Sequence, residues 1–209
     1  ANDSLFGKDD EHRLMIDVSR GTLGIYQGVE GLHEGPNVII ADFPLRWTVA
    51  GMGHLFDTGI NAVITSQRAI PATLLDPKVK NRSRIFYLMA NIEASQMAGD
   101  DNWALLLDPD GFIAEGTGDN FFIIKDNTII SPEGRNILRG ISRAYVMEEL
   151  GPQLGMAVAD SLCHRLCPLK IDLISQGLII FTELDIRKGR AMNDDFWMKC
   201  FCHRFHAFS

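Results

Sequence analysis

The stretch from Trp103 to Arg143 constrains the fold more than any other part of the chain. It holds three short apolar runs, followed by a glycine and the start of a helix. A DPDG segment at residues 108–111 follows the first run, and Asp126-Asn127 follows the second. Short apolar runs that end in such turn residues are typical of strands joined in sequence order. The stretch therefore predicts a β-meander.

Glu115 interrupts the second apolar run. It lies between FIA at residues 112–114 and GTGDN at residues 116–120, where a strand that faces a core is expected to carry no carboxylate. One interpretation is a strand end that turns outward into a Gly-rich bulge, and the spacing alone favours it. The other is a carboxylate that points into a pocket at a polar partner, because a partly buried carboxylate is costly unless something pairs with it.

A helix is predicted to begin near Ser142. Ser142 has the chemistry of an N-cap, Gly140 allows close backbone approach just before it, and the run from Arg143 to Leu154 has apolar residues at helical spacing. The free N–H groups at such a helix start suit a phosphate. Most capped helices bind nothing there, so this feature alone does not predict a ligand.

Two segments of this stretch, EGTGDNFF at residues 115–122 and NILRGISR at residues 136–143, resemble the signature of the class IV (fold type IV) pyridoxal-phosphate aminotransferases. That group holds the branched-chain and D-amino acid aminotransferases, the (R)-selective amine transaminases and aminodeoxychorismate lyase. A third segment, LDPKVKN at residues 75–81, resembles the segment that carries the family's Schiff-base lysine, here Lys80. The similarity runs from about Asn37 to Phe181, and three ordered motifs are far more specific than one.

The resemblance implies an α+β fold of the D-amino acid aminotransferase-like type with two domains. Residues 1–70 would be a remnant of the small N-terminal α/β domain, residues 71–76 the interdomain connection, and residues 77–209 the large domain that binds pyridoxal phosphate. The chain departs from the family in its first part. It lacks a counterpart of the glycine-rich segment that leads to a phosphate-binding arginine, so a truncated small domain is expected.

Hydrophobic patterning predicts further elements outside the central stretch. The helix expected after Lys80, over IFYLMANIEASQMAG, rests on the family resemblance, because this segment also resembles the family's. A polar connection and a short helix are expected over residues 156–174. The remaining predictions are strands at Leu14–Val18, Val38–Ala41, Ala62–Thr65 and Gly177–Thr182, and a helical run around Leu45–Phe56.

The resemblance assigns the chemistry to Lys80 and Glu115. Without it, a lysine beside Asn81 and Arg82 would be interpreted as a solvated surface group. With it, Lys80 is expected to hold pyridoxal phosphate as a Schiff base and to move a proton between the substrate carbon and the C4′ atom of the cofactor. Glu115 is expected to accept a hydrogen bond from the protonated pyridine nitrogen, which keeps the ring an electron sink.

The resemblance also supplies the other cofactor contacts. Leu138 would pack on the ring face, which is compatible with ordinary core packing. The N–H groups of Ile141 and Ser142, with the Ser142 hydroxyl, would hold the phosphate. Thr182 would be a further phosphate ligand, although Leu184 stands where a second threonine is usual and Glu183 would repel a phosphate.

The implied function is pyridoxal-phosphate-dependent transamination between an amino acid, with branched-chain substrates as the first guess, and a 2-oxo acid such as 2-oxoglutarate. One alternative keeps the cofactor and changes the outcome, as in aminodeoxychorismate lyase or a D-amino acid or (R)-amine transaminase. Another is a catalytically silent interaction domain. The absent arginine and the altered loop after Phe181 favour the silent domain, whereas the set of Lys80, Glu115 and Ser142 opposes it.

Composition narrows the class of protein. The chain has 209 residues, of which 46% are hydrophobic and 22% charged, and a net charge of −7. No apolar run is long enough to span a membrane and no signal peptide is seen, so a soluble cytoplasmic protein is expected. The acidic balance argues against general nucleic-acid binding. Family members are generally homodimers or larger, so self-association is expected.

The four cysteines form two close pairs, Cys163/Cys167 and Cys200/Cys202, with histidines near both. Neither spacing is usual for a zinc finger. We therefore expect free thiols in a reduced protein and no metal site.

Overall fold

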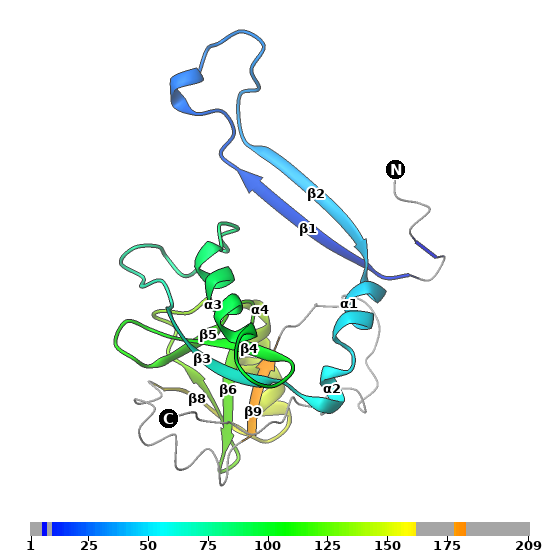
Figure 1. Ribbon diagram of the computed structural model, residues 1–209, viewed down its shortest axis with the longest axis vertical. Helices are drawn as coiled ribbons and strands as arrows, with labels where there is room; N and C mark the ends of the chain where they lie inside the picture. Colours follow the sequence, from blue (N-terminus) through cyan, green and yellow to red (C-terminus); the bar gives the residue numbers. More distant parts are fainter. Residues whose placement is uncertain (1–5, 8–9, 162–177, 183–209) are drawn as a thin grey trace. The chain divides into compact units, whose positions relative to one another are not determined.

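The computed structural model describes residues 6–7, 10–161 and 178–182, and for residues 178–182 it describes the backbone. The chain divides into two compact units, Ala1–Gly53 and His54–Ser209 (Figure 1). The domain bounds expected from the family resemblance, with a connection at residues 71–76, stay a prediction. The boundary between the two compact units lies after Gly53 and not at residues 71–76. Strand β3 (Asn61–Arg68) belongs to the second unit because it hydrogen-bonds to strand β4 (Asn102–Leu107).

The first unit is a β-hairpin followed by a helix. Strands β1 (His12–Ser19) and β2 (Asn37–Pro44) pair antiparallel, and a 3-10 turn, η2 (Gly24–Tyr26), lies in their connection (Figure 1). Helix α1 (Leu45–Met52) begins directly after Pro44, whose extended backbone ends the strand. The structure thus confirms the strands predicted near Leu14 and Val38 and the helical run that begins at Leu45.

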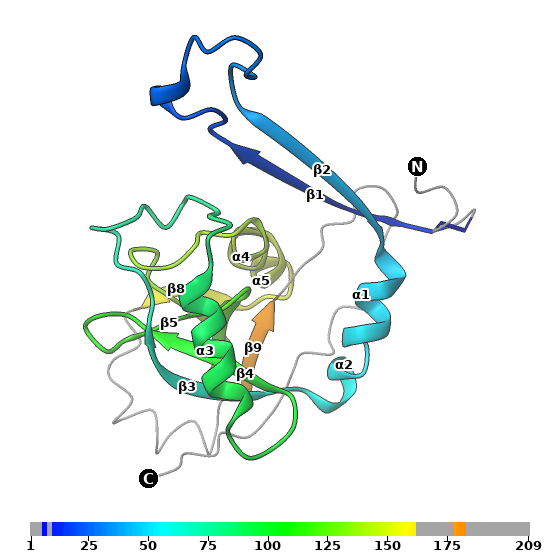
Figure 2. The ribbon, with the colours of Figure 1, turned by 45° about the horizontal axis from the view of Figure 1, so that its top comes forward.

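The second unit begins with a β-α-β arrangement. After α2 (Leu55–Thr58), β3 pairs parallel with β4, and helix α3 (Ile85–Ser95) connects them. Figures 1 and 2 both show α3 beside β3 and β4. Ala90 and Ala94 are fully buried on the inner face of α3, and such small side chains let the helix lie close to the sheet. Strand β5 (Ile113–Gly116) completes this sheet by pairing antiparallel with β4.

A second sheet has the strand order β8-β7-β6-β9. Its strands are β6 (Asn120–Lys125), β7 (Thr128–Pro132), β8 (Ala157–Ser161) and β9 (Leu178–Thr182). The predicted turn Asp126-Asn127 joins β6 to β7, and both residues have positive φ, 48° and 55°. Positive φ at both central residues is the geometry of a type I′ hairpin, whose twist matches that of the flanking strands.

The predicted meander is wrong as a single sheet. β4 and β5 pair in the first sheet, whereas β6 and β7 pair in the second. The chain changes sheet at the Gly-rich turn after Glu115, where the N–H of Gly116 donates to the Asp119 carbonyl at 3.2 Å. Both hairpins follow from local turn residues, but the break between the sheets depends on which strand each hairpin meets in the folded chain.

The polar connection predicted over residues 156–174 is also wrong for residues 157–161. Residues 157–161 form β8, which pairs parallel with β7. Five residues with two small alanines give a weak local strand signal, so the ladder with β7 decides their conformation. The rest of that prediction, over residues 162–174, lies outside the described residues.

The helix after Gly140 runs through three consecutive parts, α4 (Ile141–Tyr145), the π-helical turn η3 (Val146–Leu150) and α5 (Gly151–Gln153). The N-cap prediction for Ser142 is wrong, because Gly140 holds that position with an extended backbone. Gly140 is required there, since a Cβ on it would lie 2.6 Å from the Asn120 Oδ1 atom. The helix packs through Val146 and Met147 against Phe122 and Ile129 of the second sheet, which forms a separate buried cluster.

Replacing Gly151 by alanine tests this helix–sheet packing. A Cβ at Gly151 would lie 2.8 Å from Val158 Cγ1 and 3.0 Å from Ile129 Cδ1. We expect Gly151→Ala to destabilise the protein by about 1–3 kcal/mol through overpacking, despite the higher helix propensity of alanine. Urea unfolding measures the change. Gly118→Ala is the matched control, because nothing lies within 4 Å of its Cβ position, and an equal effect in both variants would contradict the packing described.

Candidate functional site

Glu115 is buried in β5 and paired through both carboxylate oxygens. Its side chain is 7% exposed. Oε1 accepts a hydrogen bond from the Tyr87 hydroxyl at 2.9 Å, and Oε2 accepts one from the backbone N–H of Leu138 at 2.9 Å. The interpretation of an outward-turning strand end is therefore wrong. The carboxylate points at polar partners contributed by α3 and by the segment before α4.

Burial and the neighbouring groups have opposite effects on the pKa of Glu115. Burial raises the pKa of Glu115 above its ordinary value. The hydrogen bonds from Leu138 and Tyr87 lower this pKa, and so do the positive charges of Lys80 and Arg84. The net effect is upward, so the folded chain holds this carboxylate at a cost.

Tyr87 is the partner that sequence reasoning missed. Burial and the neighbouring Glu115 carboxylate raise the pKa of Tyr87 well above its ordinary value, so its hydroxyl stays protonated and donates. A signal was present in the sequence. Tyr87 shares the inner face of α3 with Ala90 and Ala94, at positions i, i+3 and i+7, and a phenol on a buried face needs a polar partner. That signal does not name the partner, which lies 28 residues further on.

Lys80 lies in a tightly turned segment that leads into α3. The N–H groups of Lys78 and Val79 donate to Asp76, to its carboxylate and its carbonyl respectively, both at 2.9 Å. Lys80 itself is exposed, and its positive charge acts on Glu115. The structure thus brings two of the predicted site residues, Lys80 and Glu115, within electrostatic reach of each other.

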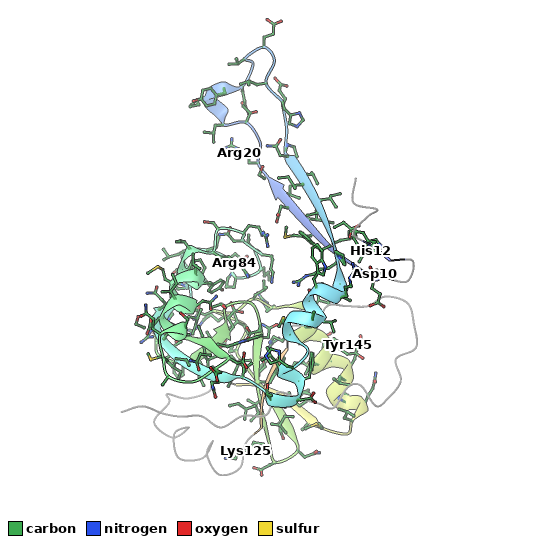
Figure 3. All side chains as sticks on the ribbon, turned by 45° about the vertical axis from the view of Figure 1, so that its right-hand side comes forward. Asp10, His12, Arg20, Arg84, Lys125 and Tyr145 are labelled. Carbon is green, nitrogen blue, oxygen red and sulfur yellow. The ribbon has the colours of Figure 1, made fainter. Side chains whose placement is uncertain are left out.

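Arg84 forms hydrogen bonds both to the segment after Lys80 and to the Gly-rich turn after Glu115. It occupies the N-cap position of α3, and its side chain is labelled in Figure 3. Its guanidinium donates to the Asn81 carbonyl at 3.1 Å and to the Thr117 carbonyl at 3.3 Å. The same group lies 5.0 Å from the centre of the Tyr87 ring, a cation–π contact.

Leu138 is held through its backbone on both sides. Its N–H donates to Glu115, and its carbonyl accepts from the Asn120 side-chain amide at 2.9 Å and from the Gly140 N–H at 2.8 Å. Asn120 is buried at the start of β6, and sequence reasoning missed its role. These contacts fix the chain between Glu115 and the first turn of the helix, while the Leu138 side chain is half-buried.

The remaining predicted residues lie at neighbouring positions. Ile141 and Ser142 are the first two residues of α4, where backbone N–H groups point out of the end of the helix. Thr182 ends β9 and stands opposite Asn120 in the β6–β9 ladder.

All four cysteines lie outside the described residues, and within the described part no cluster of three or more His, Cys, Asp or Glu side chains could hold a metal. No helix in that part is long and apolar enough to cross a membrane.

Curated relatives share part of this sequence. A putative branched-chain-amino-acid aminotransferase of Methanocaldococcus jannaschii is 37% identical over 107 residues, which cover 51% of this chain and 36% of the relative. A probable branched-chain-amino-acid aminotransferase of Rickettsia felis is 35% identical over 134 residues, which cover 61% of this chain and 44% of the relative. The chain thus spans less than half the length of these relatives.

Solved structures share the fold. The branched-chain aminotransferase of Thermoproteus uzoniensis with norvaline superposes with a TM-score of 0.62 at 23% identity, over 82% of this chain and 53% of that chain. The branched-chain amino acid aminotransferase of Thermobaculum terrenum in its PLP form gives a TM-score of 0.58 at 23% identity, over 74% of this chain and 48% of that chain. The likeness confirms the predicted α+β fold of the D-amino acid aminotransferase-like type.

The family model for amino-transferase class IV matches residues 3–163, which include Lys80, Glu115 and the helix start at Ile141. That range is more than half of the chain. The chain belongs to the class IV aminotransferase family.

Proposed function

We propose that the protein carrying this chain is a pyridoxal-phosphate-dependent aminotransferase that exchanges an amino group between an amino acid and a 2-oxo acid. The observation that carries the proposal is the buried carboxylate of Glu115, paired on both oxygens and close to the charge of Lys80. A buried carboxylate in β5 does not by itself stabilise the fold, because burial opposes its charge. The same carboxylate can stabilise a cationic ligand as its counter-ion.

The donor set at Glu115 supports pyridoxal 5'-phosphate as that ligand. Each carboxylate oxygen has two acceptor positions, and one on each is taken by Tyr87 or Leu138. The hydrogen bonds of the described residues therefore leave one acceptor position on each oxygen for a ring N–H. A buried anion at that point stabilises a protonated pyridine nitrogen, since opposite charges in a low-dielectric site favour the charged forms.

The reactive chemistry divides between the cofactor and the chain. When bound, the cofactor supplies an electron sink for the bonds of the substrate carbon. Glu115 would accept a hydrogen bond from the ring nitrogen and would hold the proton on that nitrogen. Lys80 would supply the amine that carries the cofactor. Once the substrate amine has displaced it there, the freed Lys80 amine would move the proton at the substrate carbon. Its exposed position is compatible with both roles.

We place the phosphate at the first turn of α4. The N–H groups of Ile141 and Ser142 point away from the helix body, and Gly140 is extended just before them. Leu138 lies between this turn and Glu115, so its side chain is the candidate contact for the ring face. Thr182 is proposed as a further ligand because the β6–β9 ladder sets it opposite Asn120, the partner of Leu138.

Branched-chain amino acids are the proposed donors, and 2-oxoglutarate is the proposed acceptor. The relatives named above are branched-chain aminotransferases, and another solved branched-chain amino acid aminotransferase is complexed with N-(5'-phosphopyridoxyl)-L-glutamate. We extend this substrate class to the present chain. Self-association as a homodimer or larger assembly, and a cytoplasmic location, are proposed on the family resemblance.

Replacing Lys80 by alanine tests the assignment. We expect borohydride treatment after addition of pyridoxal 5'-phosphate to label Lys80 in the unaltered chain, as identified by peptide mass, and to leave Lys80→Ala unlabelled. Transfer from L-leucine, L-isoleucine or L-valine to 2-oxoglutarate should fall at least about a hundredfold in the variant, because the proton-moving group is lost.

The matched control is Lys78→Ala, which removes an exposed lysine two residues away. It should keep both the label and the transfer activity. Label on a lysine other than Lys80 would contradict the assignment. Label on Lys80 without any amino transfer would favour the catalytically silent alternative.

Replacing Glu115 by glutamine tests whether the buried charge serves binding. The pKa of Glu115 is raised in the folded chain, so folding favours its protonated form. The stability linked to that proton is complete below the ordinary glutamate pKa and is lost as pH rises through the folded pKa. Above that pH, Glu115→Gln should have a higher urea midpoint than the unaltered apoprotein, because the variant buries no charge at this position. The same variant should bind pyridoxal 5'-phosphate at least about tenfold more weakly.

Urea unfolding at several pH values measures the first effect, and an absorbance titration with the cofactor measures the second. The control is Glu133→Gln, which removes one exposed carboxylate from the same unit. A Glu115→Gln variant that is less stable at every pH and still binds the cofactor normally would show that Glu115 has only a structural role.

A further inference from the structure

The Tyr87 hydroxyl is a side-chain donor to Glu115 contributed by a different element of the unit. Tyr87 lies on α3, is half-buried, and packs against the cluster that contains Ala90 and Ala94. Its hydroxyl reaches Oε1 at 2.9 Å, while the backbone of Leu138 reaches Oε2. Two donors from two segments therefore act on two different oxygens of one carboxylate.

We propose that Tyr87 is a positioning residue that holds the Glu115 carboxylate in its charged form and in a fixed orientation toward the ring nitrogen of the cofactor. Arg84 holds the tyrosine ring in place through its cation–π contact. The orientation toward the ring rests on the proposed function. The effect of Tyr87 on the charge of Glu115 does not depend on it.

The orientation follows from the donor geometry. One hydrogen bond leaves a carboxylate free to rotate about it, whereas two bonds to separate oxygens from fixed points set the plane of the group. The Leu138 donor is fixed because its carbonyl is itself held by Asn120. The Tyr87 donor is fixed because its ring packs against the buried cluster and lies 5.0 Å from the Arg84 guanidinium.

The charged and polar groups that act on Glu115 differ in their exposure to solvent. Lys80, in the segment before α3, is exposed, and Arg84, at the N-cap of α3, is half-exposed. Solvent therefore weakens the effect of both charges on Glu115. From α3 itself comes the hydroxyl of Tyr87, and the charge of Asp119 acts on that tyrosine. A hydroxyl in direct contact favours the ionised carboxylate without adding a charge to the site.

The proton stays on the tyrosine in this pair. The pKa of Tyr87 is raised by burial and by the charge of Glu115, so no proton moves from the phenol to the carboxylate near neutral pH. Tyr87 therefore acts as a permanent donor. Without it, burial would act on Glu115 with one hydrogen bond fewer, and the neutral acid would be the more favoured form.

The first test measures the charge of Glu115 in the apoprotein, with no cofactor present. Carbon-13 NMR of a chain labelled at the glutamate carboxyl carbons follows the Glu115 signal, which is identified by its absence in Glu115→Gln. In Tyr87→Phe, which keeps the ring and its contact with Arg84, we expect the midpoint of this titration to move to higher pH. Tyr26→Phe, the loss of one hydroxyl from the first unit, should leave it unchanged. An unchanged midpoint in Tyr87→Phe would overturn the proposal.

The second test measures binding of pyridoxal 5'-phosphate. At neutral pH the dissociation constant should rise about tenfold in Tyr87→Phe, and the loss should increase as pH falls. In a Glu115→Gln background the same substitution should have no further effect, which a purely structural role of the hydroxyl would not produce. Equal losses in both backgrounds would overturn the orientation part of the proposal.

The two tests separate this inference from the proposed function. If the unaltered chain does not bind pyridoxal 5'-phosphate, the proposed cofactor fails, and with it the orientation toward its ring nitrogen. The NMR titration still decides the effect of Tyr87 on the Glu115 charge. If the cofactor binds and the midpoint does not move, the proposed function stands and the role given to Tyr87 is wrong.

Discussion

The pairing of one buried carboxylate with donors from two other segments is the interaction on which the rest of the site depends. Glu115 connects the first sheet to α3 through Tyr87 and to the segment before α4 through Leu138. Those contacts stabilise a charge that burial opposes. Removing either donor would leave part of that cost uncompensated, so the local fold and the proposed chemistry share one set of hydrogen bonds.

The glycines around Glu115 make this arrangement possible. A Cβ on Gly116 would lie 2.2 Å from the Asp119 Oδ2 atom, and a Cβ on Gly140 would lie 2.6 Å from Asn120 Oδ1. Both glycines let a buried polar side chain approach the backbone closely. The two segments that resemble the family signature thus share one structural demand, which is close approach of Asp119 and Asn120 to a turn beside the carboxylate.

The sequence alone predicted what depends on local residues. The Asp126-Asn127 turn and the two strands of the first unit were correct because turn residues and hydrophobic patterning act over a few positions. The helix after Lys80 was correct through the family resemblance. The sheet that each strand joins was not predictable, as the separation of β5 from β6 and the pairing of β8 with β7 show. Tyr87 was missed for the same reason, since its contact with Glu115 forms only when α3 packs on the sheet.

The protonation state of the bound cofactor tests the central claim, that Glu115 is the anionic partner of a protonated ring nitrogen. Nitrogen-15 NMR of the chain loaded with pyridoxal 5'-phosphate labelled at the ring nitrogen measures this state directly. We predict a resonance in the protonated pyridinium range near neutral pH in the unaltered chain, and one in the unprotonated range in Glu115→Gln. An unprotonated nitrogen in the unaltered chain would contradict the central claim.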